Sequence, residues 1–189
     1  AKIESASASS TLGVFLTDST SAKRIYQSSS SGDLALQSAN NGGNGAISFL
    51  CNSSSLIQQG NSTTSYGTGI SDGDIIMFAF DATTGKVWTG RNGTWFNAPS
   101  TSNAGNPASG TYDSGKTLTN TDRELYSFYI GGQASSGNKK VYTNFGDGFF
   151  GTTAVSSANA DGNGHGIFEY AVPSGFLALC SKNIQSDGG

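Results

Sequence analysis

DIIMFAFDATTGKVWTGRNGTWFN, residues 74–97, decides the fold of this chain. The stretch opens with the apolar run IIMFAF between two aspartates, which has the length of a buried strand and is too short for a typical helix. The tripeptide at 83–85 predicts a tight turn, and Asn92-Gly93 predicts a hairpin because both residues tolerate a positive φ. Three antiparallel strands therefore follow one another, and the expected fold class is all-β.

Short apolar or alternating segments outside this stretch predict further strands. Polar tracts rich in Ser, Asn and Gly separate them, among them residues 52–69 and 98–120, and these tracts predict long surface loops. Since no segment shows a sustained helical periodicity, the expected architecture is an antiparallel two-sheet β-sandwich with long polar loops. The predicted strands are residues 13–17, 33–37, 46–51, 74–81, 86–90, 94–97, 125–130, 139–145, 166–171 and 175–179.

The composition is that of a folded chain with few charges. Its 189 residues include 27 glycines, charged residues make up 12%, and the net charge is −3. The 10 Lys and Arg residues are scattered and form no basic patch, which argues against nucleic-acid binding by phosphate neutralisation. No apolar run approaches the roughly 20 residues that a membrane helix needs, so no membrane insertion is expected. We predict a single domain over residues 1–189.

Two features bear on the origin of the chain and on its redox state. No signal peptide is seen, and the chain begins at Ala1 rather than Met, as expected for a processed product or an excised piece of a longer protein. Cys51 and Cys180 each end an apolar run. They are either free thiols packed as small hydrophobic residues or partners in a disulfide between distant strands, and both interpretations stay open.

Catalytic groups are scarce. His165 is the only histidine, and its glycine-rich loop without any nucleophile motif predicts a surface residue rather than a member of a triad. Glu124 begins one predicted strand and Glu169 lies within another, so a glycosidase pair across a sheet is the enzymatic alternative. Solvated carboxylates at strand ends are the simpler interpretation, and no catalytic residue is assigned.

The segment around Asp161 resembles the start of a calcium loop. Asn159, Asp161 and Asn163 have the required spacing, but the first position is Asn rather than Asp and the twelfth is Tyr170 rather than Glu. A turn built by Asx side chains accounts for the same residues. No metal and no cofactor is therefore expected, and calcium at these three residues is the alternative.

Exposed aromatic side chains provide the contact prediction. We expect Trp88 to fill the core, whereas Trp95 and Phe96 face opposite sides of a strand, so that only one of them need be exposed. Exposed aromatic rings can stack on sugars or anchor a protein partner. The predicted ligand-contact residues are Tyr66, Arg91, Asn92, Trp95 and Tyr112.

Three segments, taken in order, resemble the SPRY domain. The first is GDIIMFAFDATTGKVWTGRNGTWFN at 73–97, with Gly-Asp opening a buried strand, an Asp-x-x-x-Gly-Lys turn, an aromatic residue and Asn-Gly. The second is VYTNFG at 141–146, and the third is VPSGFLALCSKNI from Val172, which is similar to SPRY-like modules in tailed-bacteriophage structural and tail proteins. The resemblance spans residues 73–184, whereas residues 1–72 match only loosely and form a divergent N-terminal part.

The resemblance implies a bent two-sheet sandwich of the concanavalin-like, jelly-roll type. SPRY domains are binding modules without catalytic residues or cofactors, and their partners contact loops at one end of the sandwich. The implied function is a non-enzymatic, virion-associated binding or structural module, such as part of a phage tail fibre, spike or surface-decorating protein. Its partners would be a host cell-surface glycan or protein, or neighbouring virion proteins, in a monomer or a homo-oligomer. The alternatives are a capsid or tail assembly unit without a ligand, and a carbohydrate-active enzyme using Glu124 and Glu169.

Overall fold

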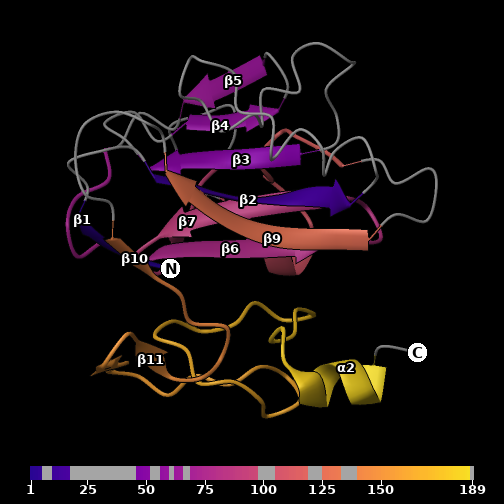
Figure 1. The fold of residues 1–189 in the computed structure, drawn as a ribbon. Helices are drawn as coiled ribbons and strands as arrows, with labels where there is room; N and C mark the ends of the chain where they lie inside the picture. The colour runs from indigo at the N-terminus through magenta and orange to yellow at the C-terminus, as the bar shows by residue number, and fades with distance from the viewer. Residues whose placement is uncertain are drawn as a thin grey trace.

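A computed structural model of the chain describes residues 1–5, 10–17, 46–51, 56–59, 62–65, 69–97, 105–118, 125–132 and 140–187 (Figure 1). These residues form mostly β-strands in small antiparallel sheets, with almost no helix among them. The all-β class predicted from the sequence is thereby confirmed. Within the same residues, no helix has the length and apolar character needed to span a membrane.

The largest sheet has five antiparallel strands in the order β5-β4-β3-β2-β9. Apolar residues at alternate positions of β3, Ile47 and Phe49, are fully buried, as the period of two along a strand requires. This sheet therefore presents one apolar face to the interior. Its strands are β2 (Ser10–Thr17), β3 (Ala46–Cys51), β4 (Leu56–Gln59), β5 (Ser62–Ser65) and β9 (Leu125–Gly132).

The stretch at 74–97 forms a second sheet in the order β6-β7-β8, as predicted. Its strands are β6 (Ile76–Asp81), β7 (Lys86–Arg91) and β8 (Thr94–Trp95). The Asp81 carboxylate stabilises the first turn by accepting a hydrogen bond from the Thr83 N–H at 2.8 Å. In the second turn, Asn92 and Gly93 have φ values of 49° and 86°, the left-handed pair that a tight hairpin requires.

Two short strands form a separate two-stranded sheet that a single bridge connects to the chain just before β6. β1 (Lys2–Ser5) pairs antiparallel with β10 (Lys140–Tyr142), and on its other side Lys2 bridges to Ile75, just before β6. The Ile3 N–H donates to the Asp74 carbonyl at 2.9 Å and closes the same junction. The strand predicted at 139–145 is therefore present but shorter.

Among the residues that the structure describes, one buried cluster joins both sheets. The ring of Phe49 on β3 stacks on the ring of Phe96, which follows β8, with 6.1 Å between the ring centroids. Apolar side chains from the two sheets thus exclude water together. The cluster consists of Ile3, Ile47, Phe49, Cys51, Ile57, Ile70, Ile76, Val87, Phe96 and Leu118.

Strand β7 is buried on both of its faces. Val87 and Trp88, which point to opposite sides of the strand, are 0% and 1% exposed. Val87 belongs to the core cluster, whereas the Trp88 ring packs edge-on against Phe176, with 5.7 Å between centroids. The prediction that Trp88 lies in the interior is confirmed.

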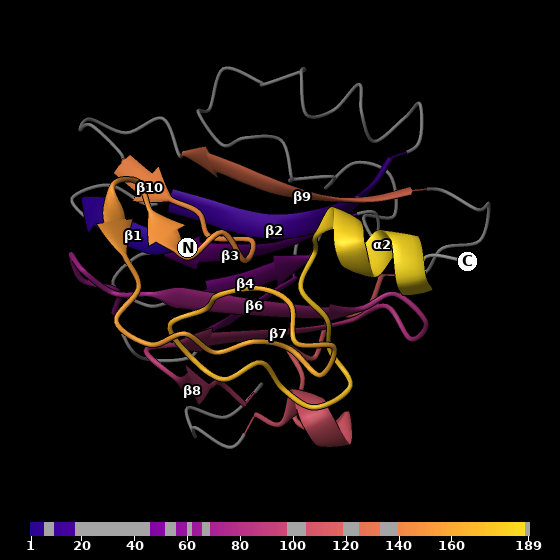
Figure 2. The same ribbon diagram turned by 90° about the horizontal axis from the view of Figure 1, so that it is seen from below.

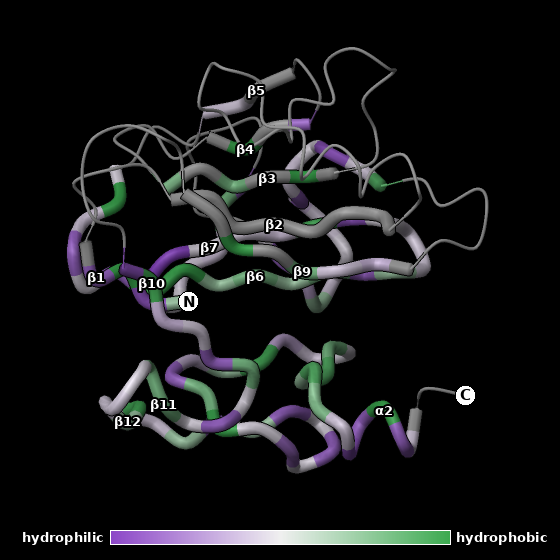
Figure 3. Tube along the Cα trace, viewed as in Figure 1, coloured by the Kyte–Doolittle hydropathy of each residue, from purple (hydrophilic) through white to green (hydrophobic). Residues whose placement is uncertain are grey.

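The C-terminal segment, residues 143–187, packs over the face of the second sheet that carries Trp88. It lies along β6 and β7 in both ribbon views (Figures 1 and 2). It contains a small hairpin of β11 (Phe149–Phe150) and β12 (Thr153–Ala154) and ends with helix α2 (Ser181–Asp187). Hydrophobic and hydrophilic positions are interspersed along it (Figure 3). Its exposed large apolar side chains are Phe145, Phe149, Ile167, Leu177, Leu179 and Ile184.

The strands predicted at 166–171 and 175–179 are wrong. Gly166 and Gly175, the first residues of the two segments, have left-handed φ values of 82° and 85°, and only Phe168 makes a backbone bridge, to Asn159. The Ala178 N–H donates to the Asp161 carboxylate at 2.8 Å instead of joining a strand ladder. Both stretches are irregular, and several of their large apolar side chains are exposed.

The tract predicted as a loop at 52–69 contains two strands, β4 and β5, so that prediction is also wrong there. Backbone pairing to β3 places β4 in the sheet, and β5 then pairs with β4 at the sheet edge. The strand predicted at 33–37 falls outside the described residues.

Candidate functional site

Residues 105–118, here called the Tyr112 loop, lie along β7 and β8. At the start of the loop the Gly105 N–H donates to the Trp95 carbonyl at 3.2 Å. Towards its end, the Ser114 N–H donates to the Val87 carbonyl at 2.8 Å, and Thr117 bridges to Lys86. Both ends of the loop are therefore fixed by backbone bonds to the second sheet.

Glycines allow the close approach at both ends. A Cβ atom on Gly105 would overlap the Phe96 carbonyl oxygen, and one on Gly85 would overlap the carbonyl oxygen of Leu118. Gly85 also has a φ of 69°, which disfavours any other residue. The Tyr112 loop fits against the sheet because no side chain stands between them.

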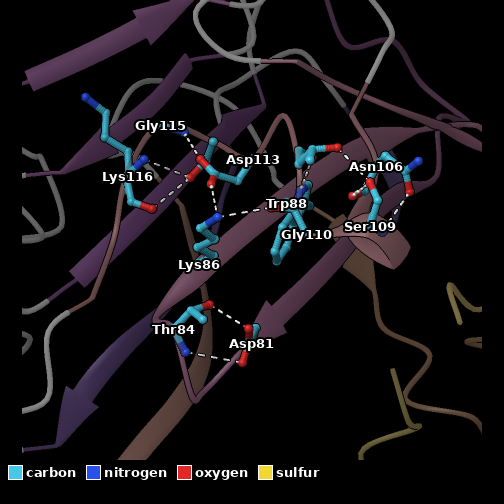
Figure 4. A network of polar contacts seen from close by, with 12 residues as sticks. Asp81, Thr84, Lys86, Trp88, Asn106, Ser109, Gly110, Asp113, Gly115 and Lys116 are labelled. Atoms are coloured by element: carbon cyan, nitrogen blue, oxygen red, sulfur yellow. Dashed lines mark hydrogen bonds and ion pairs between the residues drawn. The ribbon is translucent and has the colours of Figure 1, made fainter. Parts of the chain in front are cut away.

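Polar contacts support the middle of the loop from beneath (Figure 4). The Trp88 Nε1–H donates to the Thr111 carbonyl at 3.0 Å, and the Lys86 Nζ donates to the Gly110 carbonyl at 3.0 Å. Lys86 also pairs with Asp113 at 3.5 Å. Because Trp88 is buried, its hydrogen bond ties the loop to the interior of the protein.

A short 3-10 helix, η1 (Pro107–Ser109), shapes the first half of the loop. The Asn106 side chain caps it by accepting from the Ser109 N–H at 3.2 Å, and Gly110 ends it in the left-handed conformation. The hydroxyls of Ser109 and Thr111 lie 2.6 Å apart. Pro near the start and Gly after the end are the expected residues for such a turn.

Tyr112 stands out within this supported loop. It is 58% exposed, more than any other aromatic residue whose side chain the structure describes. Its φ is 53°, a left-handed value that costs a residue with a bulky side chain on the order of 1–2 kcal/mol. The surrounding bonds hold Tyr112 in this conformation and turn its ring towards solvent.

The other predicted contact residues have structural partners or lie elsewhere. Arg91 donates to the Gly69 carbonyl and pairs with Asp74 at 3.7 Å. Asn92 accepts from the Ile75 N–H at 2.8 Å and donates to Asp74 at 2.6 Å. Both side chains therefore fasten the chain that leads into β6.

Trp95 and Tyr66 complete that set of predicted residues. Trp95 is half-buried, while its neighbour Phe96 is 3% exposed, so the interior one of this pair is Phe96. The Gly105 bond places the start of the Tyr112 loop next to Trp95. Tyr66 falls outside the described residues.

The residues of the enzymatic alternative are only partly described. Glu169 accepts hydrogen bonds from the Ser156 hydroxyl and from the Ser156 N–H, the latter at 2.6 Å. These bonds lower the pKa of Glu169 and favour its ionised form. Glu124 lies outside the described residues, and the half-buried His165 donates its backbone N–H to Asp161 at 2.8 Å.

The Asp161 carboxylate is surrounded by hydrogen-bond donors. The N–H groups of Asn163, His165 and Ala178 and the Nδ2 of Asn183 all donate to it, at 2.7–3.0 Å. Burial alone would raise the pKa of this carboxyl, but these bonds outweigh it and lower the pKa to about 2. Donors of this kind occupy the lone pairs that a calcium ion would need. Among the described residues, no cluster of three or more His, Cys, Asp or Glu could hold a metal.

The two cysteines are free thiols, which answers the question left open by the sequence. Cys51 is buried in the core cluster, and burial raises the pKa of its thiol to about 12. Cys180 is half-buried just before α2. Neither thiol is part of the Tyr112 loop.

The sequence predicts Tyr112 as a contact residue but not the loop structure that holds it. The Asn-Pro start and the Gly110 end of η1 were a usable signal for an ordered turn inside the polar tract. Comparisons of this chain with protein-family models, with curated proteins and with solved structures find no match.

Proposed function

We propose that this chain is a non-enzymatic binding module whose Tyr112 loop contacts a ligand on a host cell surface. The observation that carries the proposal is Tyr112 itself, an aromatic side chain that is 58% exposed and held in a strained conformation. Strain maintained by surrounding structure is typical of functional positions. A rigid, exposed aromatic ring binds with little loss of conformational entropy.

The proposal includes a concanavalin-like sandwich of the SPRY type. The stacking of Phe49 on Phe96 and the shared buried cluster support two sheets packed face to face. The SPRY-like stretch at 73–97 builds the second sheet, and the Tyr112 loop is fixed to it. A virion location, on a phage tail fibre, spike or decorating protein, is proposed from the likeness of the segment starting at Val172 to such modules.

Binding of the purified chain to bacterial cells and to their surface fractions tests this function. The expected result is saturable binding to the cells of at least one host, which Tyr112→Ala weakens about tenfold or more. Phe149→Ala is the matched control, since this aromatic residue is 47% exposed in the β11–β12 hairpin, outside the Tyr112 loop. Loss of binding in the control variant alone would contradict the role of the loop.

A second candidate is an assembly unit whose edge strand is completed by a neighbouring virion protein. Among the described strands, β9 is at the edge of its sheet, and its Phe128 and Ile130 are 37% and 45% exposed. Open edges with apolar residues invite strand pairing with another chain. Light scattering on the purified chain tests this candidate. A stable monomer at high concentration counts against it.

A further inference from the structure

We infer that the Tyr112 loop recognises an uncharged saccharide, with the Tyr112 ring stacked on the apolar face of a sugar. The inference rests on the proposed function and names the ligand class of the same site. Sugars present C–H groups on one face and hydroxyls around the rim. A site for them needs an exposed aromatic ring together with uncharged hydrogen-bonding groups.

The charges of the loop are already neutralised or buried. Asp113 pairs with Lys86, which also donates to the Gly110 carbonyl beneath the loop. The one other charged residue of the loop, Lys116, is 8% exposed. A phosphate, a nucleic acid or an acidic peptide is recognised by accessible cations, usually several together. This surface therefore matches an uncharged ligand.

The apolar content of the loop also differs from that of a protein-binding surface. Protein interfaces concentrate several large aromatic and aliphatic anchors in a desolvated centre. Here Tyr112 is the single large apolar side chain exposed on residues 105–118, since Pro107 and Leu118 are buried. One ring among polar groups suits a sugar better than a second protein.

Exposed polar side chains in fixed positions precede Tyr112 in the same loop. Asn106, Ser109 and Thr111 are exposed, and hydrogen bonds among them set their orientations. A backbone bridge between Asn106 and Thr111 closes this part of the loop immediately before Tyr112. Hydroxyl and amide groups retain donor or acceptor capacity beyond these bonds, so they can bind sugar hydroxyls.

An array of immobilised oligosaccharides, uncharged, sialylated and sulfated, provides the direct test with the full chain as probe. We expect binding to uncharged members, unchanged between low and high salt because no ion pair contributes. Tyr112→Phe should retain this binding, whereas Tyr112→Ala should weaken it about tenfold or more through loss of the ring. Salt-sensitive binding confined to the charged members would overturn the inference.

Tyr112→Gly separates a binding defect from a folding defect. Glycine accepts the φ of 53° without strain, so this variant should melt at the same temperature as the wild type or higher, yet not bind. A Tyr112→Gly variant with full affinity would exclude the ring as the contact.

Treated host cells distinguish failure of this inference from failure of the proposed function. Periodate oxidation of the cell surface should abolish binding, and protease treatment should leave it. The reverse pattern would refute the sugar and keep the binding function, with a surface protein as ligand. Absence of binding to any untreated cell or fraction would refute both.

Discussion

The Thr89 hydroxyl is the one buried side-chain polar atom without a hydrogen-bond partner in the described part of the chain. Thr89 is 0% exposed, lies opposite Phe78 in the β6–β7 ladder, and shares the strand face of Val87. A buried hydroxyl loses its hydrogen bonds to water, and because Thr89 gains none within the protein, it destabilises the fold. The residue is a weak point at the centre of the second sheet.

Thr89→Val should therefore stabilise the protein by about 1 kcal/mol, since it keeps the branched shape and removes the orphaned hydroxyl. The free energy of unfolding in urea measures the change. Thr94→Val, at an exposed position of β8, is the control and should alter stability by less than about 0.5 kcal/mol. A less stable Thr89→Val variant would mean that the hydroxyl is bonded in solution.

At the scale of elements, the sequence predicted those strands and turns that local periodicity and turn residues determine. The strands at 46–51 and 86–90 and the Asn92-Gly93 hairpin are confirmed, because alternation and positive φ are local properties. The β5 sequence STTS carries no apolar signal, and only its pairing with β4 makes it a strand. Helix α2, seven residues long, is too short to show a helical stripe.

The candidate site, too, is only partly predictable from the sequence. Tyr112 could be predicted as a contact residue because aromatic residues are rare in the polar tract at 98–120. Other features of the site depend on contacts between distant segments. They are the strained φ of Tyr112, the hydrogen bond from Trp88 to the loop, and the close backbone approaches at Gly85 and Gly105. No periodicity or spacing encodes such contacts.

Gly85→Ala tests whether the close approach of the Tyr112 loop to the second sheet contributes to stability. A methyl group there would collide with the Leu118 carbonyl oxygen, a backbone atom, so we expect a loss of stability well above 2 kcal/mol. Gly73→Ala is matched in backbone strain, with a φ of 89°, but its methyl group would have no atom within 4 Å. This control should cost only about 1 kcal/mol. Thermal melting of both variants gives the comparison, and equal losses would show that strain alone acts at Gly85.

At the scale of the whole molecule, Asp161 holds the C-terminal segment together. Its carboxylate links the loop at 161–165 to Ala178 and to Asn183 of α2, and Asn183 also donates to the Ala178 carbonyl at 2.9 Å. The same segment carries Phe176, which covers Trp88. Loss of the carboxylate should therefore loosen the cover of the second sheet.

Asp161→Asn should lower stability by roughly 2 kcal/mol at pH 7, because an amide replaces a charged acceptor among four donors. The folded pKa of about 2 lies below the ordinary value of 3.8, so the carboxylate stabilises the fold fully above pH 4 and progressively less towards pH 2. The difference in urea midpoint between wild type and variant should shrink over that window, and Trp fluorescence reports it.

Asp147→Asn, at an exposed carboxyl, serves as the control and should follow the wild type at every pH. A stability difference between wild type and Asp161→Asn that stays constant from pH 7 to pH 2 would refute the assignment of the effect to the Asp161 charge.

Strand β1 also sets an order of events during synthesis. Lys2 pairs with Ile75 on one side and with Tyr142 on the other, so the sheet closes over two very different lengths of chain. At roughly 5–20 residues per second, translation supplies the second partner about 3–13 s after the first. Until then one edge of β1 stays unpaired on the nascent chain, where it can meet other strands. Slower or chaperone-dependent folding of the last 50 residues is the expected consequence.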